Sequence, residues 1–285
     1  LMNFIYSLQD VKISLERINE IHQSRNEESK NNQMKEFAGE KAIRINEISF
    51  RYDPHSLKKT LDNITFEIPE GKVTAIVGAS GSGKTTLIKL MLGYYPVSEG
   101  AIMVSGKNIN EYNLKWWRRC CGVVMQDGVI FSESIARNIA VGDSEVDIAR
   151  LEQAARIACI HDYILSLPLK YNTKIGRDGV GLSQGQKQRI LIARAVYKNP
   201  VFIFLDEATN SLDAKNEREI VENLDDFYKG RTVVVVAHRL STVKNADQIV
   251  VIDSGKVVEK GTHTELIEKQ GGYFNLVKNQ LELGN

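Results

Sequence analysis

The stretch Gly78-Ala79-Ser80-Gly81-Ser82-Gly83-Lys84-Thr85 decides the fold of this chain. It follows the β-forming run Val73–Val77 and precedes an apolar run at 86–92 that is typical of a helix. This order of strand, glycine loop and helix, with the spacing G-x-x-x-x-G-K-T, indicates the phosphate loop of a nucleoside triphosphatase. Glycines let backbone N–H groups surround a polyphosphate, and the helix start adds further unpaired N–H groups. The alternative, a flexible Gly/Ser turn, would not need the flanking strand and helix.

Two side chains complete the chemistry that this loop predicts. Lys84 adds a full positive charge that can reach the β- and γ-phosphates of a nucleotide. The hydroxyl of Thr85 can ligate Mg²⁺, a hard cation that prefers oxygen ligands. We therefore expect ATP or a related nucleotide at this loop, together with Mg²⁺.

Two further apolar runs indicate strands buried on both faces of a parallel sheet. The run 201–205 ends in Asp206 and Glu207, and the run 231–237 ends in His238. Because ligands lie at the carboxyl ends of such strands, we expect Asp206 to bind Mg²⁺ and Glu207 to act as a base on water. His238 can contact a γ-phosphate and hold the attacking water. A structural carboxylate pair and a satisfied core histidine are the alternatives.

Composition excludes several other classes of protein. The chain has 285 residues, is 42% hydrophobic and carries a formal net charge of +1, so no general attraction to nucleic acid is expected. The three cysteines have neither metal-ligand spacing nor a disulfide framework, which favours a reducing compartment. No apolar segment is long enough to span a bilayer. The chain starts at a leucine, and we expect it to be a piece of a longer polypeptide.

The chain divides into three parts by pattern. Residues 1–25 are expected to form a helix with one apolar stripe, made by Phe4, Leu8, Val11, Leu15 and Ile18. Such a stripe either packs on its own domain or a copy of itself, or belongs to a helix that leaves an apolar environment. Residues 26–41 are expected to be a solvated linker, and the folded domain 42–285 to follow. Its first strand, near 43–50, shows a phase shift that indicates a bulge, and residues 127–184 are expected to form a helical insert.

The motifs occur in the order found in ATP-binding cassette (ABC) transporters, and the chain resembles their nucleotide-binding domain from about residue 42 to the C-terminus. Tyr52 resembles the aromatic residue that stacks on adenine, although a lone aromatic is more often part of a core. Gln126 resembles the glutamine that senses γ-phosphate and Mg²⁺, and Leu182-Ser183-Gln184-Gly185-Gln186 resembles the signature motif. The resemblance implies an α/β fold of the P-loop NTPase (RecA-like) type, with a mixed, mainly parallel sheet, an N-terminal antiparallel β subdomain and an inserted helical subdomain.

The resemblance also implies a set of site residues. Catalytic roles fall on Glu207, His238, Gln126 and Lys84, and metal-binding roles on Thr85, Gln126 and Asp206. The residues expected to contact nucleotide are Tyr52, Gly78, Ala79, Ser80, Gly81, Ser82, Gly83, Lys84, Thr85, Thr86, Asp206, Ser183, Gly185, Gln186 and Asp213.

The resemblance implies that each nucleotide is shared between two subunits. Ser183 and Gly185 precede a helix whose N-terminus can bind an anion, and in the family that anion is the γ-phosphate held by the other subunit. Two copies would then pair head to tail around two ATP molecules, with Asp213 at the seam. Two residues depart from the family pattern: Gln184 stands where glycine is usual, and Arg177 where exporters commonly have an acidic residue. We expect the first to leave the motif working and the second to change docking charge.

The N-terminal helix resembles the cytosolic end of the last membrane helix of an exporter. Residues 182–198 are similar to bacterial exporters of bacteriocins and related peptides, some of which carry an N-terminal cysteine-protease domain. The resemblance therefore implies peptide export, membrane domains in the same polypeptide, and a place on the cytoplasmic face of the plasma (inner) membrane. Soluble cassette ATPases of DNA repair are disfavoured, because the roughly one hundred residues between Gly78 and Leu182 leave no room for their coiled coil. A nucleotide switch without turnover is disfavoured by Glu207 and His238.

Overall fold

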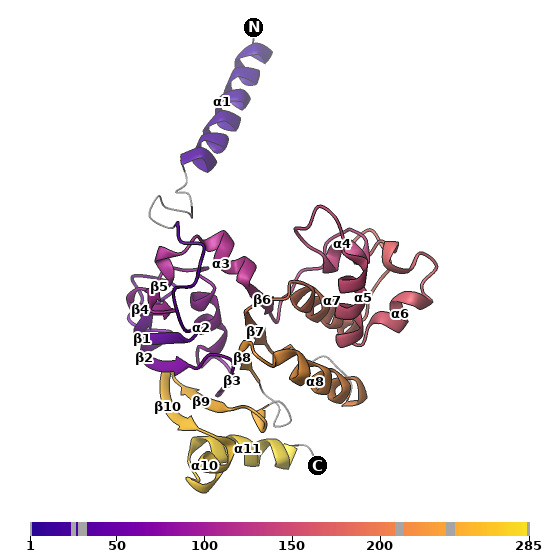
Figure 1. Cartoon of the computed structure of the whole chain (residues 1–285). Helices are drawn as coiled ribbons and strands as arrows, with labels where there is room; N and C mark the ends of the chain where they lie inside the picture. The colour runs from indigo at the N-terminus through magenta and orange to yellow at the C-terminus, as the bar shows by residue number, and fades with distance from the viewer. Residues whose placement is uncertain (1, 24–26, 28–32, 209–213, 238–242, 284–285) are drawn as a thin grey trace.

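A six-stranded sheet forms the centre of the protein in a computed structural model, which describes residues 2–23, 27, 33–208, 214–237 and 243–283 (Figure 1). Its strand order is β10-β9-β3-β8-β7-β6, with β10 antiparallel to β9 and every other pair parallel. The carboxyl ends of the parallel strands therefore meet at one edge. The strands are β3 Val73–Val77, β6 Cys121–Val124, β7 Phe202–Asp206, β8 Thr232–Val236, β9 Gln248–Asp253 and β10 Lys256–Gly261.

A second, antiparallel sheet of four strands has the order β2-β1-β4-β5. The register of β1 against β2 shifts between Ile45 and Ile48, and Glu47 between them has a φ of 51°. The bulge expected in the first strand is therefore present. The strands of this sheet are β1 Ile43–Phe50, β2 Leu61–Ile68, β4 Glu99–Val104 and β5 Lys107–Asn108.

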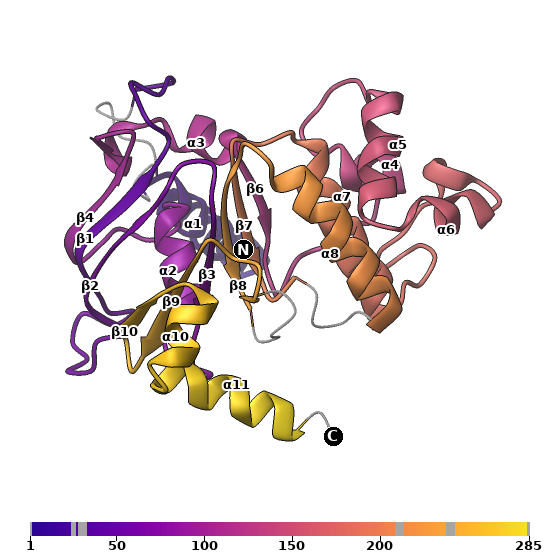
Figure 2. The ribbon, with the colours of Figure 1, turned by 60° about the horizontal axis from the view of Figure 1, so that its bottom comes forward.

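The large sheet is covered on both faces because successive residues of its central strands are buried on opposite sides. Phe204 packs into one core and its neighbour Leu205 into the other. The first face meets the small sheet and the helices α2 Lys84–Met91, η1 Ile109–Glu111 and α3 Leu114–Cys120. The second face meets α7 Gln184–Tyr197, α8 Ala214–Tyr228, α10 His263–Glu268 and α11 Gly272–Leu283 (Figure 2).

A group of helices between β6 and β7 stands to one side of the sheet (Figure 1). It comprises α4 Ile135–Ile139, α5 Ile148–Ile157, α6 His161–Ser166 and η2 Lys170–Asn172, which pack on α7. The predicted architecture is thereby confirmed: a mainly parallel sheet, an antiparallel β subdomain and an inserted group of helices. The domain bounds at residues 42, 127 and 184 stay predictions.

Helix α1, Met2–Gln23, extends away from the rest of the molecule (Figure 1). The members of its apolar stripe are exposed, from 51% for Ile18 to 68% for Phe4. In the described part of the chain, no helix is both long and apolar enough to cross a membrane. Residues near the end of the expected linker do pack: the Phe37 ring lies 4.8 Å from that of Trp116, between ring centroids, and 5.5 Å from that of Phe202.

Candidate functional site

The phosphate loop and the carboxylate pair lie at the same edge of the large sheet. Strand β3 leads into the loop at Gly78, and β7 ends at Asp206. Strand β8 lies between them, pairing Ile76 of β3 and Asp206 of β7 with its own Val236. Since all three strands run in one direction, the side chains that follow them meet at the carboxyl edge.

Two glycines give the phosphate loop its path. Gly78 has a φ of 150°, and a Cβ atom there would lie 2.0 Å from the carbonyl oxygen of Ile252 in β9. Gly83, with a φ of 106°, precedes α2, and its Cβ would lie 2.6 Å from a methyl carbon of Leu61. Larger residues would therefore push the loop off the strands beside it. No side chain caps α2, so its first N–H groups remain available to an anion.

Lys84 is folded back onto the loop that carries it. Its Nζ donates to the carbonyl oxygens of Gly78 at 2.9 Å and Ala79 at 2.8 Å, and the residue is 5% exposed. Burial lowers the pKa of Lys84, and the nearby carboxylates of Glu207 and Asp206 oppose that change. The strand pairing puts Asp206 at the end of β7, and Glu207 after it, at the same edge as this ammonium.

Asp206 is completely buried, and neither of its carboxylate oxygens has a hydrogen-bond partner of ordinary geometry among the described residues. Burial raises its pKa, while the nearby Thr85 hydroxyl and the Lys84 ammonium act in the opposite direction. A buried carboxylate without partners is costly unless a cation shares it. The described residues hold no cluster of three or more His, Cys, Asp or Glu, so a cation here would have few protein ligands. This suits Mg²⁺, which is commonly held by one or two carboxylates and the phosphates.

Glu207 follows with a different backbone conformation. Its φ of 53° is in the left-handed region, and its N–H donates to the carbonyl oxygen of Val236 at 3.1 Å. A non-glycine residue held in this region is unusual and often belongs to a functional site. The residue is half-buried.

Of the other residues predicted for this edge, Gln126 is described and two are not. Gln126 follows β6, which pairs with β7 through Val124 and Leu205, and it is exposed. It therefore belongs to the same edge as Asp206. His238 and Asp213 lie outside the described residues.

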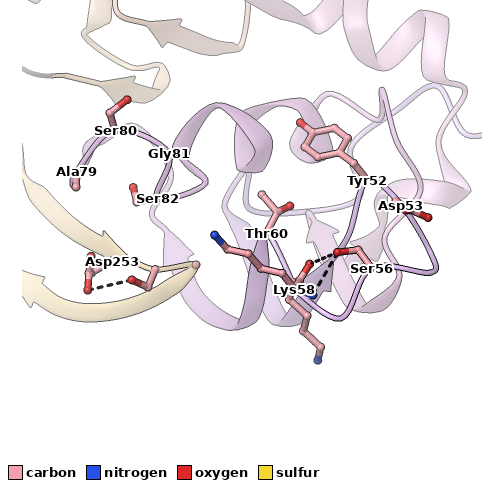
Figure 3. Close-up of a pocket in the computed structure, with 13 residues that line it drawn as sticks. Tyr52, Asp53, Ser56, Lys58, Thr60, Ala79, Ser80, Gly81, Ser82 and Asp253 are labelled. Carbon is pink, nitrogen blue, oxygen red and sulfur yellow. Dashed lines mark hydrogen bonds between the residues drawn. The ribbon is translucent and has the colours of Figure 1, made fainter.

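Tyr52 and the phosphate loop line opposite sides of one cavity of about 590 Å³ (Figure 3). The ring of Tyr52 is 51% exposed and stands edge-on to those of Phe50 and Tyr95, with centroids 5.0 and 5.3 Å away. Its hydroxyl lies 3.1 Å from that of Thr86 in α2. The half-exposed ring favours the stacking role for Tyr52 over the core role.

The cavity also contains a contribution that the sequence pattern did not indicate. Asp253 at the end of β9, with Ser254 and Gly255 in the turn to β10, lines the cavity, and Figure 3 shows Asp253 on the side of the phosphate loop. The N–H of Gly255 donates to the carbonyl oxygen of Ser82 at 3.2 Å. No sequence motif assigned this turn to the cavity, because its position there depends on the long-range pairing of β9 with β3.

The signature residues form the start of α7. Ser183 Oγ accepts from the N–H of Gln186 at 3.2 Å, and Gln186 Oε1 accepts from the N–H of Ser183 at 2.8 Å. This reciprocal capping box fixes the helix N-terminus. Ser183 and Gln184 are exposed, and Gly185 is half-buried. Ser183, Gly185 and Gln186 do not line the cavity next to the phosphate loop, so within one chain the two halves of the expected nucleotide site are separate.

Comparisons with known proteins agree with this geometry. Residues 61–210, more than half of the chain, match the family model described as ABC transporter. The leukotoxin translocation ATP-binding protein LktB of Mannheimia haemolytica is 42% identical over 276 residues, which cover 96% of this chain and 38% of that protein. LktB of Bibersteinia trehalosi gives the same values. A bacterial Atm1-family ABC exporter solved with ATP bound matches with a TM-score of 0.90 at 32% identity, covering 97% of this chain and 49% of that one.

The chain therefore belongs to the ABC transporter family, and it is similar to exporters of that family. The matched region includes the part that binds ATP in this family, so the predicted resemblance and fold class are confirmed. The chain spans 38% of the length of the curated relatives that it matches.

Proposed function

We propose that this domain binds and hydrolyses ATP with Mg²⁺ and thereby drives the export of a substrate across a membrane. The observation that carries the proposal is the convergence of the phosphate loop with the buried Asp206 and with Glu207 at one edge of the sheet. The similarity to exporters supports the transport half of the proposal.

In the proposed reaction, each residue acts at a stated place on ATP. Lys84 leaves the loop carbonyls and, with the loop N–H groups, offsets the charge of the β- and γ-phosphates. Asp206 and Thr85, with Gln126, would hold Mg²⁺, and the bound ion would supply positive charge beside the phosphate oxygens. Glu207 accepts a proton from the attacking water, and His238 holds that water in position. Tyr52 stacks on adenine.

The second proposal within this mechanism is that one chain supplies half of each site. The α7 N-terminus carries Ser183, Gly185 and Gln186, and its exposed start suits contact with the γ-phosphate of another molecule. Two copies would pair head to tail around two ATP molecules, with Asp213 at the seam. Hydrolysis removes the phosphate that bridges the copies and lets them separate.

The remaining proposals concern the longer protein. Residues 1–25 are the cytosolic end of the last transmembrane helix, 26–41 are the linker, and 42–285 are the ATPase domain with its insert at 127–184. The exposed apolar stripe of α1 and the relatives' greater length support this division. We propose a peptide or bacteriocin as cargo and the cytoplasmic face of the plasma membrane as location. The similarity to leukotoxin translocation proteins supports the export of such a cargo.

A phosphate-release assay on Glu207→Gln tests the proposed chemistry. The amide cannot accept the proton of water, so we expect turnover to fall by roughly 10²–10⁴-fold while ATP binding, measured by calorimetry, is retained. Wild-type turnover should disappear when Mg²⁺ is removed. The matched control is Glu70→Gln, an exposed carboxylate before the opposite end of β3, which should leave turnover unchanged. Undiminished hydrolysis by Glu207→Gln would exclude Glu207 as the base.

A further inference from the structure

A second cavity of about 590 Å³ lies between α5, α7 and α8, away from the phosphate loop. Its lining includes Arg231, directly before β8, and Asn199, shortly before β7. These residues precede their strands, so the cavity lies at the amino edge of the parallel sheet, and ATP is expected at the carboxyl edge. Its volume is within the range of sites for small molecules.

Arg231 brings a positive charge to this cavity that no described acidic residue matches. Its Nη2 donates to Asn199 Oδ1 at 2.7 Å, and its Nη1 donates to the carbonyl oxygen of Phe227 at 2.5 Å; both acceptors are neutral. The guanidinium lies 4.1 Å above the centre of the Phe227 ring. Burial lowers the pKa of Arg231, consistent with a cation that has lost water and gained no counter-charge.

The other charges at the cavity are matched locally. Arg150 Nη2 lies 2.7 Å from an Asp143 oxygen, and Asp226 lies 2.6 Å from Lys229 Nζ. Among the charged residues that line the cavity, Arg231 is therefore the one whose printed acceptors are all neutral. Arg150 is the second guanidinium of the lining; it lies 4.1 Å from the centre of the Tyr197 ring, and its side chain is 41% exposed. Each guanidinium has five N–H donors, so both can bind a further acceptor beside the partners named here.

The rest of the lining suits a ligand that is only partly polar. Apolar surface comes from Ala154, Ile157 and Val196, and the ring of Phe227 is also present. Gln153 and Asn223 supply side-chain amides. A bare inorganic ion would leave this apolar surface unused.

We propose that this cavity binds a small organic anion, with a carboxylate or phosphate group at Arg231 and Arg150 and an apolar body against Ile157, Val196 and Phe227. The site is distinct from the nucleotide site, and its existence does not depend on the proposed ATPase mechanism.

Occupation of the cavity would also affect turnover, and this part rests on the proposed function. Helix α7 begins at the signature residues and ends at the cavity, and α5 belongs to the helical insert. Helix α8 follows the segment that contains Asp213. An anion bound by Arg150 of α5 and by Arg231 would fix the insert relative to the sheet, so that the start of α7 moves less freely between partners.

The test uses phenyl phosphate and benzoate as probes, with benzamide as the neutral analogue. The chain is first saturated with ADP and Mg²⁺, so that the phosphate loop is filled, and each probe is then titrated by calorimetry and by amide chemical shifts. We expect at least one anion to bind with a dissociation constant in the millimolar range or below, benzamide not to bind, and shifts to gather on α5, α7 and α8. Comparison of the two anions shows whether phosphate or carboxylate is preferred.

Matched variants assign the binding to the two arginines. Arg231→Gln and Arg150→Gln should each weaken the anion about tenfold or more, since each removes a charge-assisted hydrogen bond. The Arg150 side chain is 41% exposed, so this variant keeps the test valid if Arg231→Gln fails to fold. The controls, Arg156→Gln on α5 and Arg218→Gln on α8, remove exposed arginines that pair with Glu152 and Glu222 of their own helices, and both should bind as wild type. Binding of neither anion at 10 mM, or equal binding by Arg150→Gln, would overturn the proposal.

Discussion

Asp206 is a residue whose proposed function lowers the stability of the nucleotide-free protein. It is fully buried without a hydrogen-bond partner of ordinary geometry among the described residues, and burial raises its pKa. Between the unfolded pKa of about 3.9 and the higher folded value, the folded state binds more protons than the unfolded state. The free energy of unfolding therefore falls as the pH rises through that window, and the stability contribution of the protonated form is lost.

Asp206→Asn should stabilise the nucleotide-free protein at neutral pH by about 1–3 kcal/mol, because a buried charge without partners is removed. The variant should also lack the share of pH dependence described above. Urea unfolding at pH 4 and pH 7, without Mg²⁺ and nucleotide, measures both effects, and Asp178→Asn in an exposed loop is the control. If the free energy of unfolding changed by the same amount between pH 4 and pH 7 in wild type and variant, this account of Asp206 would be contradicted.

Tyr52→Ala should weaken ATP binding by roughly 10-fold or more, because stacking of a base on an aromatic ring contributes about 1–3 kcal/mol. The dependence of turnover on Mg²⁺ concentration should stay unchanged, since Tyr52 lies across the cavity from the phosphate loop. Calorimetry with ATP measures the affinity. Tyr6→Ala, which removes an exposed tyrosine of α1, is the control. Unaltered ATP affinity would assign Tyr52 to the packing of Phe50 and Tyr95 alone.

At the scale of elements, the start of α7 combines a structural and a proposed functional role. The capping box of Ser183 and Gln186 stabilises the helix, and the same residues are proposed to contact the nucleotide of a partner. A variant at Ser183 therefore needs a control variant that removes a helix N-cap away from the proposed interface between the two copies. Ser134, which caps α4 by accepting from the N–H of Arg137 at 3.2 Å, provides it.

Ser183→Arg should abolish turnover and leave the binding of ATP by a single chain intact, because the large side chain blocks the partner's phosphate and does not reach the chain's own loop. Ser134→Arg should lose a comparable cap, worth about 1 kcal/mol, and keep its turnover. Phosphate release and titration with ATP separate the two quantities. Retained turnover by Ser183→Arg would refute the shared site.

The same scale shows which features the sequence allowed us to predict. The phosphate loop, the buried strands and the bulge of β1 follow from local patterns, because each is encoded within a few consecutive residues. Contacts between distant elements were not predictable in this way. His161 Nδ1 lies 2.8 Å from the Tyr171 hydroxyl, and His263 Nδ1 lies 2.8 Å from that of Tyr273, yet these histidines had no expected partner.

The contacts of two charged side chains were missed for the same physical reason. Glu259 in β10 accepts hydrogen bonds from the N–H groups of Gly272 at 2.5 Å and Tyr273 at 3.0 Å, and so caps α11. Arg118 in α3 donates to the carbonyl oxygen of Leu92 at 3.0 Å, after the last residue of α2, and pairs with Glu27. Both depend on how the elements pack, which no local pattern specifies. Among the candidate site residues, the placement of His238 and Asp213 stays outside the described part of the chain.

At the scale of the whole molecule, the residues of the proposed site lie in two separate places on one chain. The phosphate loop and Tyr52 line the same cavity, and the signature residues at the start of α7 do not line it. We therefore propose that a single chain binds ATP but cannot complete the reaction alone. The proposed anion cavity lies at the other edge of the sheet, where it can change how the insert moves without contacting ATP.

The most direct test of the shared site is the rate of ATP hydrolysis per molecule of protein across a wide dilution series, with sedimentation of the same samples in ATP and Mg²⁺. If two copies complete each site, the rate per molecule falls on dilution in step with the fraction of dimer. A constant rate per molecule across the series, with only single chains in the sedimentation profile, would contradict the account.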